Sequence, residues 1–202
     1  MSYNHKIIDQ KFHLKGLINK TVCQQLIKFY EDNKHMAGPE ESYKFEHDKK
    51  IKDNFSCLNI SYLRNNKGFE EPYKIILNYL RIVLANYENF VRTTLCPSFK
   101  NIFMTNTNNI RILKYDIGQC IKDHSDIDGF TRGSLTINLN DDYEGGEFRF
   151  FGGQEKVKLS EGEAMLFPAE PIWIHGTEPI TKGARYTINC FLRLPPQMPE
   201  IK

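Results

Sequence analysis

The sequence has no continuous apolar run of the roughly 20 residues that a membrane-spanning helix needs. Its first residues also lack the apolar stretch and small-residue cleavage site of a secretory signal. Nor does one charge dominate, since 27 Lys and Arg residues stand against 25 Asp and Glu residues. A near-neutral chain has no field that attracts nucleic acid or an anionic membrane. We therefore expect a cytoplasmic protein whose partner is a peptide, a protein or a small molecule, with no nucleic-acid or membrane partner, and the oligomeric state stays open.

Cysteines are also few and scattered. The five cysteines are an odd number, and no two of them form a Cys-x-x-Cys pair, which argues against a disulfide framework or a structural zinc site. At 202 residues, with 40% hydrophobic and 12% aromatic content, the chain is long enough to bury a core without such cross-links. We expect one domain over residues 1–202.

The first hundred residues have the texture of helices. Residues 19–33 place apolar side chains at helical spacing after Asn19, a residue type that caps helices. Residues 72–96 carry a longer apolar stripe, which begins with a proline suited to the first turn of a helix. A short strand is expected within residues 11–18. We predict that residues 1–100 form a helical support with an N-terminal strand.

The pattern changes near residue 100 to short β-type runs separated by glycine-containing and acidic turns. Eight such runs without long helices between them favour antiparallel strands in two packed sheets. The expected fold is mainly β with supporting helices, and residues 101–194 form a jelly-roll core, or double-stranded β-helix. The eight runs are residues 110–115, 120–124, 134–140, 147–151, 155–159, 164–168, 172–175 and 184–194.

Three potential metal ligands lie in the β half. His124 and Asp126 are two residues apart, so in an extended segment both side chains face the same side. His175 ends a later predicted strand. Two imidazoles and one carboxylate on one face of a metal, with the other face open, suit non-haem Fe(II). A structural zinc site would contain more sulfur and a fourth protein ligand.

A basic side chain follows the second histidine on the last predicted strand. Arg185 has Thr187 on the same side of that strand. A guanidinium inside a barrel is costly unless a carboxylate meets it, and its fork geometry favours a bidentate pair. A dicarboxylic cosubstrate fits this requirement.

Four ordered motifs carry a resemblance to a known family. They are the tyrosine, glycine and His-x-Asp of residues 115–126, the Leu-Asn and Gly-Gly-Glu of residues 137–147, and the segments 162–168 and 175–186. The stretch 115–194 resembles the 2-oxoglutarate and Fe(II)-dependent oxygenase superfamily, specifically its prolyl 4-hydroxylase-like branch. Arg185 stands where many members of that branch carry lysine, and Ile121 stands where an aromatic residue is common.

The resemblance implies roles for named residues. It assigns the Fe(II) to His124, Asp126 and His175, with no catalytic residue beyond these ligands. It assigns the distal carboxylate of 2-oxoglutarate to Arg185. The other implied cosubstrate contacts are Tyr115, Thr187 and Asn138, the last at a position where the family residue type differs.

The implied activity is a 2-oxoglutarate-dependent dioxygenase of the prolyl 4-hydroxylase type. It uses O2 to hydroxylate an unactivated C–H bond, releases succinate and CO2, and takes ascorbate as its reductant. The favoured substrate is a prolyl residue of a peptide or protein. Two alternatives stay open: an oxygenase acting on a free amino acid or other small molecule, and a cupin-like metal-binding module that does not turn over 2-oxoglutarate.

Overall fold

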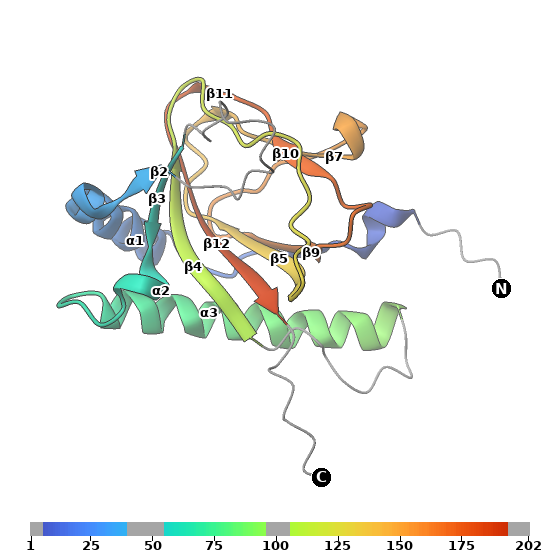
Figure 1. Ribbon diagram of the computed structural model, residues 1–202, viewed down its shortest axis with the longest axis horizontal. Coiled ribbons are helices and arrows are strands. Elements are labelled where there is room, and N and C mark those ends of the chain that lie inside the picture. Colours follow the sequence, from blue (N-terminus) through green and yellow to red (C-terminus); the bar gives the residue numbers. More distant parts are fainter. Residues whose placement is uncertain (1–5, 40–54, 96–105, 194–202) are drawn as a thin grey trace, which may run out of the picture.

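The computed structural model describes residues 6–39, 55–95 and 106–193 (Figure 1). Its α-helices are α1 (Lys20–Asn33), α2 (Ile60–Leu63) and α3 (Glu70–Phe90), and a π-helical turn continues α3 over Val91–Leu95. Short 3-10 turns cover Ile7–Gln10, Lys34–Met36 and Phe151–Gly153. The strands are β1 (Phe12–Leu14), β2 (Gly38–Pro39), β3 (Ser56–Asn59), β4 (Asn106–Tyr115), β5 (Thr131–Asn138), β6 (Glu144–Gly145), β7 (Phe148–Phe150), β8 (Glu155–Val157), β9 (Ala164–Pro168), β10 (His175–Thr177), β11 (Ile180–Lys182) and β12 (Arg185–Arg193).

These strands form one large sheet and two small ones. The large sheet has seven strands in the order β1-β9-β5-β12-β4-β3-β2, and the small sheets have the orders β10-β7-β8 and β11-β6. The pairings between these strands are antiparallel. This arrangement confirms the predicted mainly β fold with a jelly-roll core and supporting helices. The first hundred residues also supply three strands of the large sheet, whereas the sequence indicated one.

The helices cover one face of the large sheet. Asn19 caps α1 by accepting a hydrogen bond from the backbone N–H of Val22 at 3.0 Å, as its position predicted. The long α3 lies along the lower side of the sheet in Figure 1. Within the described residues, no helix is long and apolar enough to cross a membrane. The buried residues at helical spacing are Cys23, Leu26 and Tyr30 in α1 and Ile76, Leu80, Val83 and Tyr87 in α3.

The two faces of the large sheet differ in composition because successive side chains of a strand point to opposite sides. We call the side packed against the helices the helix face and the opposite side the interior face. The helix face of the three central strands is apolar, with Ile110, Ile112, Leu135, Ile137, Ile188, Cys190 and Leu192. The alternate positions on the interior face are largely polar, with Arg111, Ser134, Thr136, Asn138, Arg185, Thr187 and Asn189.

Two of the eight predicted strands are wrong. Residues 120–124 form no strand, and only an isolated bridge joins His124 to His175. Residues 172 and 173 lie in a turn closed by a hydrogen bond from the Trp173 N–H to the Glu170 carbonyl, and Ile174 is not in a strand, so β10 starts at His175. Both segments are short and lie beside a strand without forming a continuous ladder with it, and periodicity alone cannot distinguish so short a run from a strand.

Candidate metal centre

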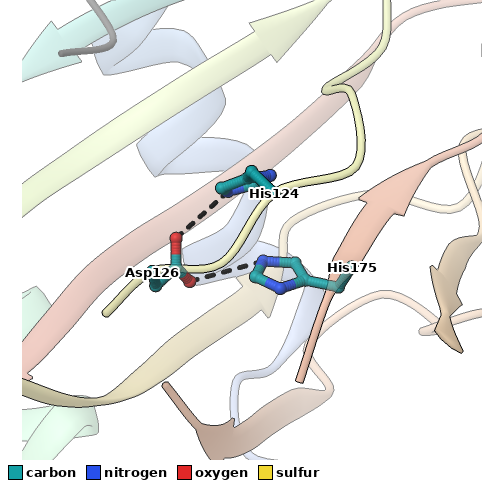
Figure 2. A group of neighbouring side chains, drawn as sticks. All are labelled: His124, Asp126 and His175. Carbon is teal, nitrogen blue, oxygen red and sulfur yellow. Dashed lines mark ion pairs between the residues drawn. The ribbon is translucent and has the colours of Figure 1, made fainter. Parts of the chain in front are cut away.

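His124, Asp126 and His175 come together at one point (Figure 2). Paired backbone hydrogen bonds of 2.9 Å in both directions join His124 to His175 and align the loop 116–130 with the start of β10. The Asp126 Oδ1 atom lies 3.1 Å from the His124 Nε2 atom, and its Oδ2 atom lies 3.3 Å from the His175 Nε2 atom. One ligand atom from each residue lies within 4.8 Å of the other two.

Backbone carbonyl groups fix both imidazoles. The His124 Nδ1 atom is 2.7 Å from the carbonyl oxygen of Lys122, and the His175 Nδ1 atom is 3.0 Å from that of Trp173. Because a carbonyl only accepts, each Nδ1 atom carries the hydrogen. The Nε2 atoms therefore face Asp126, and they are the atoms that would bind a metal.

The carboxylate between the two rings is held by a serine. Asp126 is 7% exposed at its side chain, and the Ser134 hydroxyl on β5 donates a hydrogen bond to its Oδ2 atom. Burial raises the pKa of Asp126, but hydrogen bonds and charge from the two histidines outweigh burial and hold that pKa below its usual range.

The donor set fits a divalent metal with open positions. It offers two imidazole nitrogens and one carboxylate within the described residues, a set that suits Fe(II) and leaves room for further ligands. The site is reachable, because the His124 side chain is 33% exposed whereas that of His175 is 5% exposed.

Arg185 is the second unusual feature of the interior face. It is 2% exposed, and no carboxylate among the described residues forms an ion pair with it. Its guanidinium carbon lies 4.8 Å from the Phe148 ring centroid and 5.5 Å from that of Tyr115. A buried cation held by aromatic faces calls for an anion, so the surroundings of Arg185 fit the carboxylate of a bound ligand.

A glycine turn makes room for this arginine. Gly146 has a φ of 70°, and a Cβ atom there would lie 2.6 Å from the Ile180 Cδ1 atom and 3.1 Å from the Arg185 Cδ atom. A side chain at this position would therefore displace the arginine as well as strain the backbone.

Asn138 holds Arg185 from the neighbouring strand. Its Oδ1 atom accepts hydrogen bonds from Arg185 Nε at 3.3 Å and from the Tyr143 hydroxyl at 3.2 Å. Its Nδ2 atom donates to the carbonyl groups of Asn140 and Leu159. Asn138 thus lies beside the predicted carboxylate-binding group and fixes its orientation.

The remaining two predicted cosubstrate contacts also lie on the interior face. Tyr115 is paired with Arg185 across β4 and β12, and Thr187 is paired with Asn138 across β12 and β5. The Thr187 hydroxyl donates to the Asn189 Oδ1 atom at 2.9 Å. All seven predicted site residues therefore belong to the metal cluster or to the group around Arg185.

The spacing between the two parts matches a small dicarboxylate. Asn138, which holds Arg185, and Ser134, which holds Asp126, are four residues apart on β5, or about 13 Å by strand rise. That length accommodates a guanidinium, a five-carbon dicarboxylate and a metal in series.

The sequence interpretation missed Ser134 and Phe148. Ser134 has the same strand parity as Asn138, and this signal was sufficient to place it inside the barrel. Phe148 packs over Arg185 from β7, a three-residue strand of the small sheet β10-β7-β8. No local sequence pattern indicates such a contact between sheets.

Residues 110–193 match the sequence model of the 2OG-Fe(II) oxygenase superfamily. This part of the chain is therefore similar to that superfamily. The oxygenases of this superfamily use Fe(II), 2-oxoglutarate and O2, so the match supports those cofactors for the His-Asp-His cluster and the arginine site. No curated protein matches the sequence.

Solved structures share the fold of this protein. A prolyl hydroxylase from Trichoplax adhaerens, in complex with a hypoxia inducible factor oxygen degradation domain peptide fragment, is 14% identical with a TM-score of 0.66, covering 93% of this chain and 87% of its own. A Pseudomonas putida prolyl-4-hydroxylase is 14% identical with a TM-score of 0.63, covering 93% and 97%. The viral collagen prolyl hydroxylase of Paramecium Bursaria Chlorella virus-1, as its 2OG complex, is 14% identical with a TM-score of 0.60, covering 92% and 97%.

Proposed function

We propose that this protein is an Fe(II)- and 2-oxoglutarate-dependent dioxygenase that hydroxylates a prolyl residue of a peptide or protein. The observation that carries the proposal is the pairing of two features inside one barrel. One is the His124, Asp126 and His175 cluster, and the other is a buried Arg185 with no carboxylate partner among the described residues.

The metal and its cosubstrate supply the oxidising power when bound, by coupling the decarboxylation of 2-oxoglutarate to the insertion of one oxygen atom into a C–H bond. The chain supplies geometry. The carbonyl groups of Lys122 and Trp173 hold the two imidazoles in their metal-binding tautomer, and Ser134 orients Asp126.

The cosubstrate would lie between the two clusters. Arg185, fixed by Asn138, would pair with the distal carboxylate through two parallel N–H bonds. Tyr115 lies across from Arg185 on β4, and Thr187 lies two residues beyond Arg185 on the same face of β12. The buried rings of Phe148, Phe150 and Phe167 line the adjoining interior and exclude water from it.

The choice of a peptidyl proline rests on the shared fold with three prolyl hydroxylases, one of them solved with a peptide fragment. The alternative substrate is a free amino acid or another small molecule, and the assay described next includes free proline for this reason. By the same resemblance, we propose ascorbate as the reductant that keeps the iron reduced. The cytoplasm stays the proposed location.

The test is an oxygen-insertion assay. The protein is incubated with Fe(II), 2-oxoglutarate, ascorbate and either proline-rich peptides or free proline, and the products are analysed by mass spectrometry. We expect a gain of one oxygen atom on a peptide proline together with an equal amount of succinate, and neither product from the His175→Ala variant. The Arg81→Gln variant, which changes an exposed arginine of α3, is the matched control. Absence of 2-oxoglutarate turnover from the intact protein would contradict the proposal.

A further inference from the structure

The interior face carries a second arginine that the family resemblance does not assign. Arg111 lies on β4, four residues before Tyr115, and is 5% exposed. It alternates with Ile110 and Ile112, which belong to the core on the helix face. Its side chain therefore points into the same barrel interior as Arg185.

Arg111 lies near the metal end of that interior. Its guanidinium carbon is 4.7 Å from the ring centroid of Phe191. Phe191 is paired with Ser134 across β12 and β5, and Ser134 donates to the metal ligand Asp126. The two arginines thus mark different ends of the interior: Arg185 is at the cosubstrate end, and Arg111 is at the level of the metal.

The electrostatic surroundings agree with this position. Burial lowers the pKa of Arg111, while the charge of Asp126 acts in the opposite direction. A guanidinium retains its proton under such conditions, because its ordinary pKa is far above neutrality. The interior next to the metal ligands therefore contains a full positive charge.

Asn189 provides a second donor beside Arg111. The two residues are paired directly across β12 and β4. The Asn189 Oδ1 atom accepts hydrogen bonds from the hydroxyls of Thr136 at 3.3 Å and Thr187 at 2.9 Å. These bonds fix the amide so that its NH2 group faces away from them, and no described residue accepts a hydrogen bond from that group. Asn189 is half-buried, so a ligand can reach it.

We infer that Arg111 and Asn189 form a subsite for a carboxylate of the substrate that is hydroxylated. The inference rests on the proposed function and narrows its substrate class to prolyl compounds with a carboxylate close to the oxidised ring. Guanidinium and amide N–H groups on one rung of a sheet suit the two oxygens of a carboxylate. Two sources share this chemistry: an Asp or Glu side chain next to the proline, and the α-carboxylate of a carboxy-terminal or free proline.

The position of the subsite favours the substrate over the cosubstrate. Arg185 and Thr187 already mark the end that would take the distal carboxylate of 2-oxoglutarate. The Arg111 guanidinium stacks on Phe191, which lies six residues beyond Arg185 on β12, and so it turns away from that end. A carboxylate held there would approach the metal from the side opposite to Arg185.

The experiment compares matched prolyl probes. One pair of peptides differs only in Asp or Asn next to the proline, and a second pair ends in proline with a free or an amidated carboxy terminus. Free proline is included as a separate probe. Competition assays read by mass spectrometry give the ratio of kcat/KM for each acidic probe over its neutral partner. Equilibrium binding to protein loaded with Mn(II) and 2-oxoglutarate gives the same preference without turnover.

For the intact protein, we expect at least one acidic probe to be preferred by about tenfold or more, as is typical of a buried charge-assisted contact. In Arg111→Met, which keeps an unbranched side chain against Phe191, the ratio falls toward one while the melting temperature and the KM for 2-oxoglutarate stay unchanged. Arg111→Lys restores part of the preference, and Arg81→Met leaves it intact. The pair of probes whose acidic-to-neutral ratio falls in Arg111→Met identifies the source of the carboxylate.

Three results separate the possibilities. An equal preference in the intact protein and in Arg111→Met overturns the subsite. A raised KM for 2-oxoglutarate without a change in the acidic-to-neutral ratio assigns Arg111 to the cosubstrate and also overturns it. If the intact protein oxidises no prolyl probe, the prolyl part of the proposed function fails, and the binding preference on the Mn(II)-loaded protein still decides whether Arg111 recognises a carboxylate.

Discussion

The two faces of the seven-stranded sheet consist of alternate residues of the same strands, yet they have opposite compositions. On β12, Ile188, Cys190 and Leu192 belong to the core between the sheet and the helices α1 and α3. Arg185, Thr187 and Asn189 point into the barrel. The helix face gains stability from apolar area removed from water. The interior face buries polar groups that need partners.

Adjacent residues of one strand therefore have different roles: one side chain stabilises the fold, and the next faces the binding site. Asn138 holds Arg185, Ser134 holds the metal ligand Asp126, and Asn189 accepts a hydrogen bond from Thr187. Apolar residues at these positions would pack more simply and leave nothing for a charged ligand to bind. We therefore expect substitutions on the interior face to change binding and turnover, and substitutions on the helix face to change the free energy of unfolding.

The largest effect is expected at a metal ligand. His124→Ala removes one of the two imidazoles of the metal cluster from a partly exposed position. The rate of 2-oxoglutarate turnover should fall by more than about 100-fold, which exceeds the usual loss for a residue that only orients a metal ligand. The free energy of unfolding, measured in urea, should change by less than about 1 kcal/mol. His35→Ala, at an exposed position outside the barrel, is the control. Retention of a tenth of the activity by His124→Ala would remove this residue from the site.

Neighbouring residues on β12 test the contrast between the faces most directly. Ile188→Ala empties a fully buried position on the helix face and should lower the free energy of unfolding by about 2 to 5 kcal/mol. The affinity of the folded protein for 2-oxoglutarate should remain unchanged. Thr187→Val keeps the shape but removes a hydroxyl, so stability should change by about 1 kcal/mol while that affinity falls. The reverse pattern would contradict the division of roles.

A smaller effect is expected where the chain orients a ligand. Ser134→Ala removes the hydrogen bond to Asp126 and should weaken metal binding by about 10- to 100-fold, the usual effect of losing such an orienting contact. Titration with Mn(II) measures the change, and Ser160→Ala at an exposed turn is the matched control. An unchanged affinity in Ser134→Ala would show that the serine does not position the carboxylate.

The smallest effect concerns an ion pair that ties α1 to the helix face. The Tyr186 hydroxyl donates to Glu31 at 2.6 Å, and Lys114 lies 3.0 Å from the same carboxylate. The hydrogen bond from Tyr186, opposed by burial and assisted by the lysines, lowers the pKa of Glu31 from 4.5 to about 2. A depressed pKa stabilises the fold above the unfolded value, so this contribution is complete above pH 4.5 and disappears as the pH falls toward 2.

Glu31→Gln should therefore lower the free energy of unfolding at pH 7 by about 1 kcal/mol, a modest value because the carboxylate is partly exposed. The two proteins should converge in stability near pH 2, as followed by urea denaturation at a series of pH values. Glu155→Gln, which changes a glutamate of β8 outside this ion pair, is the matched control. A constant difference at all pH values would contradict the role of the charge.

The site could be predicted from the sequence because four ordered motifs resemble those of a known family, and that resemblance brings His124, Asp126, His175 and Arg185 together. Strand parity correctly placed Arg185 and Thr187 on the same face of β12. The helical periodicity of residues 19–33 predicted α1. The two-residue strands β2 and β6 could not be predicted, because so short a segment has no period. The packing of Phe148 over Arg185 could not be predicted either, because it depends on how two sheets face each other.

The measurement that tests the central claim most directly is the binding of 2-oxoglutarate to the Mn(II)-loaded protein. Titration calorimetry is compared for the intact protein, Arg185→Gln and the matched surface variant Arg81→Gln. If the interior face is the cosubstrate site, Arg185→Gln should weaken binding by about 100-fold or more, because a desolvated charge pair is lost, while Arg81→Gln should bind like the intact protein. Equal affinities for all three proteins would contradict the account.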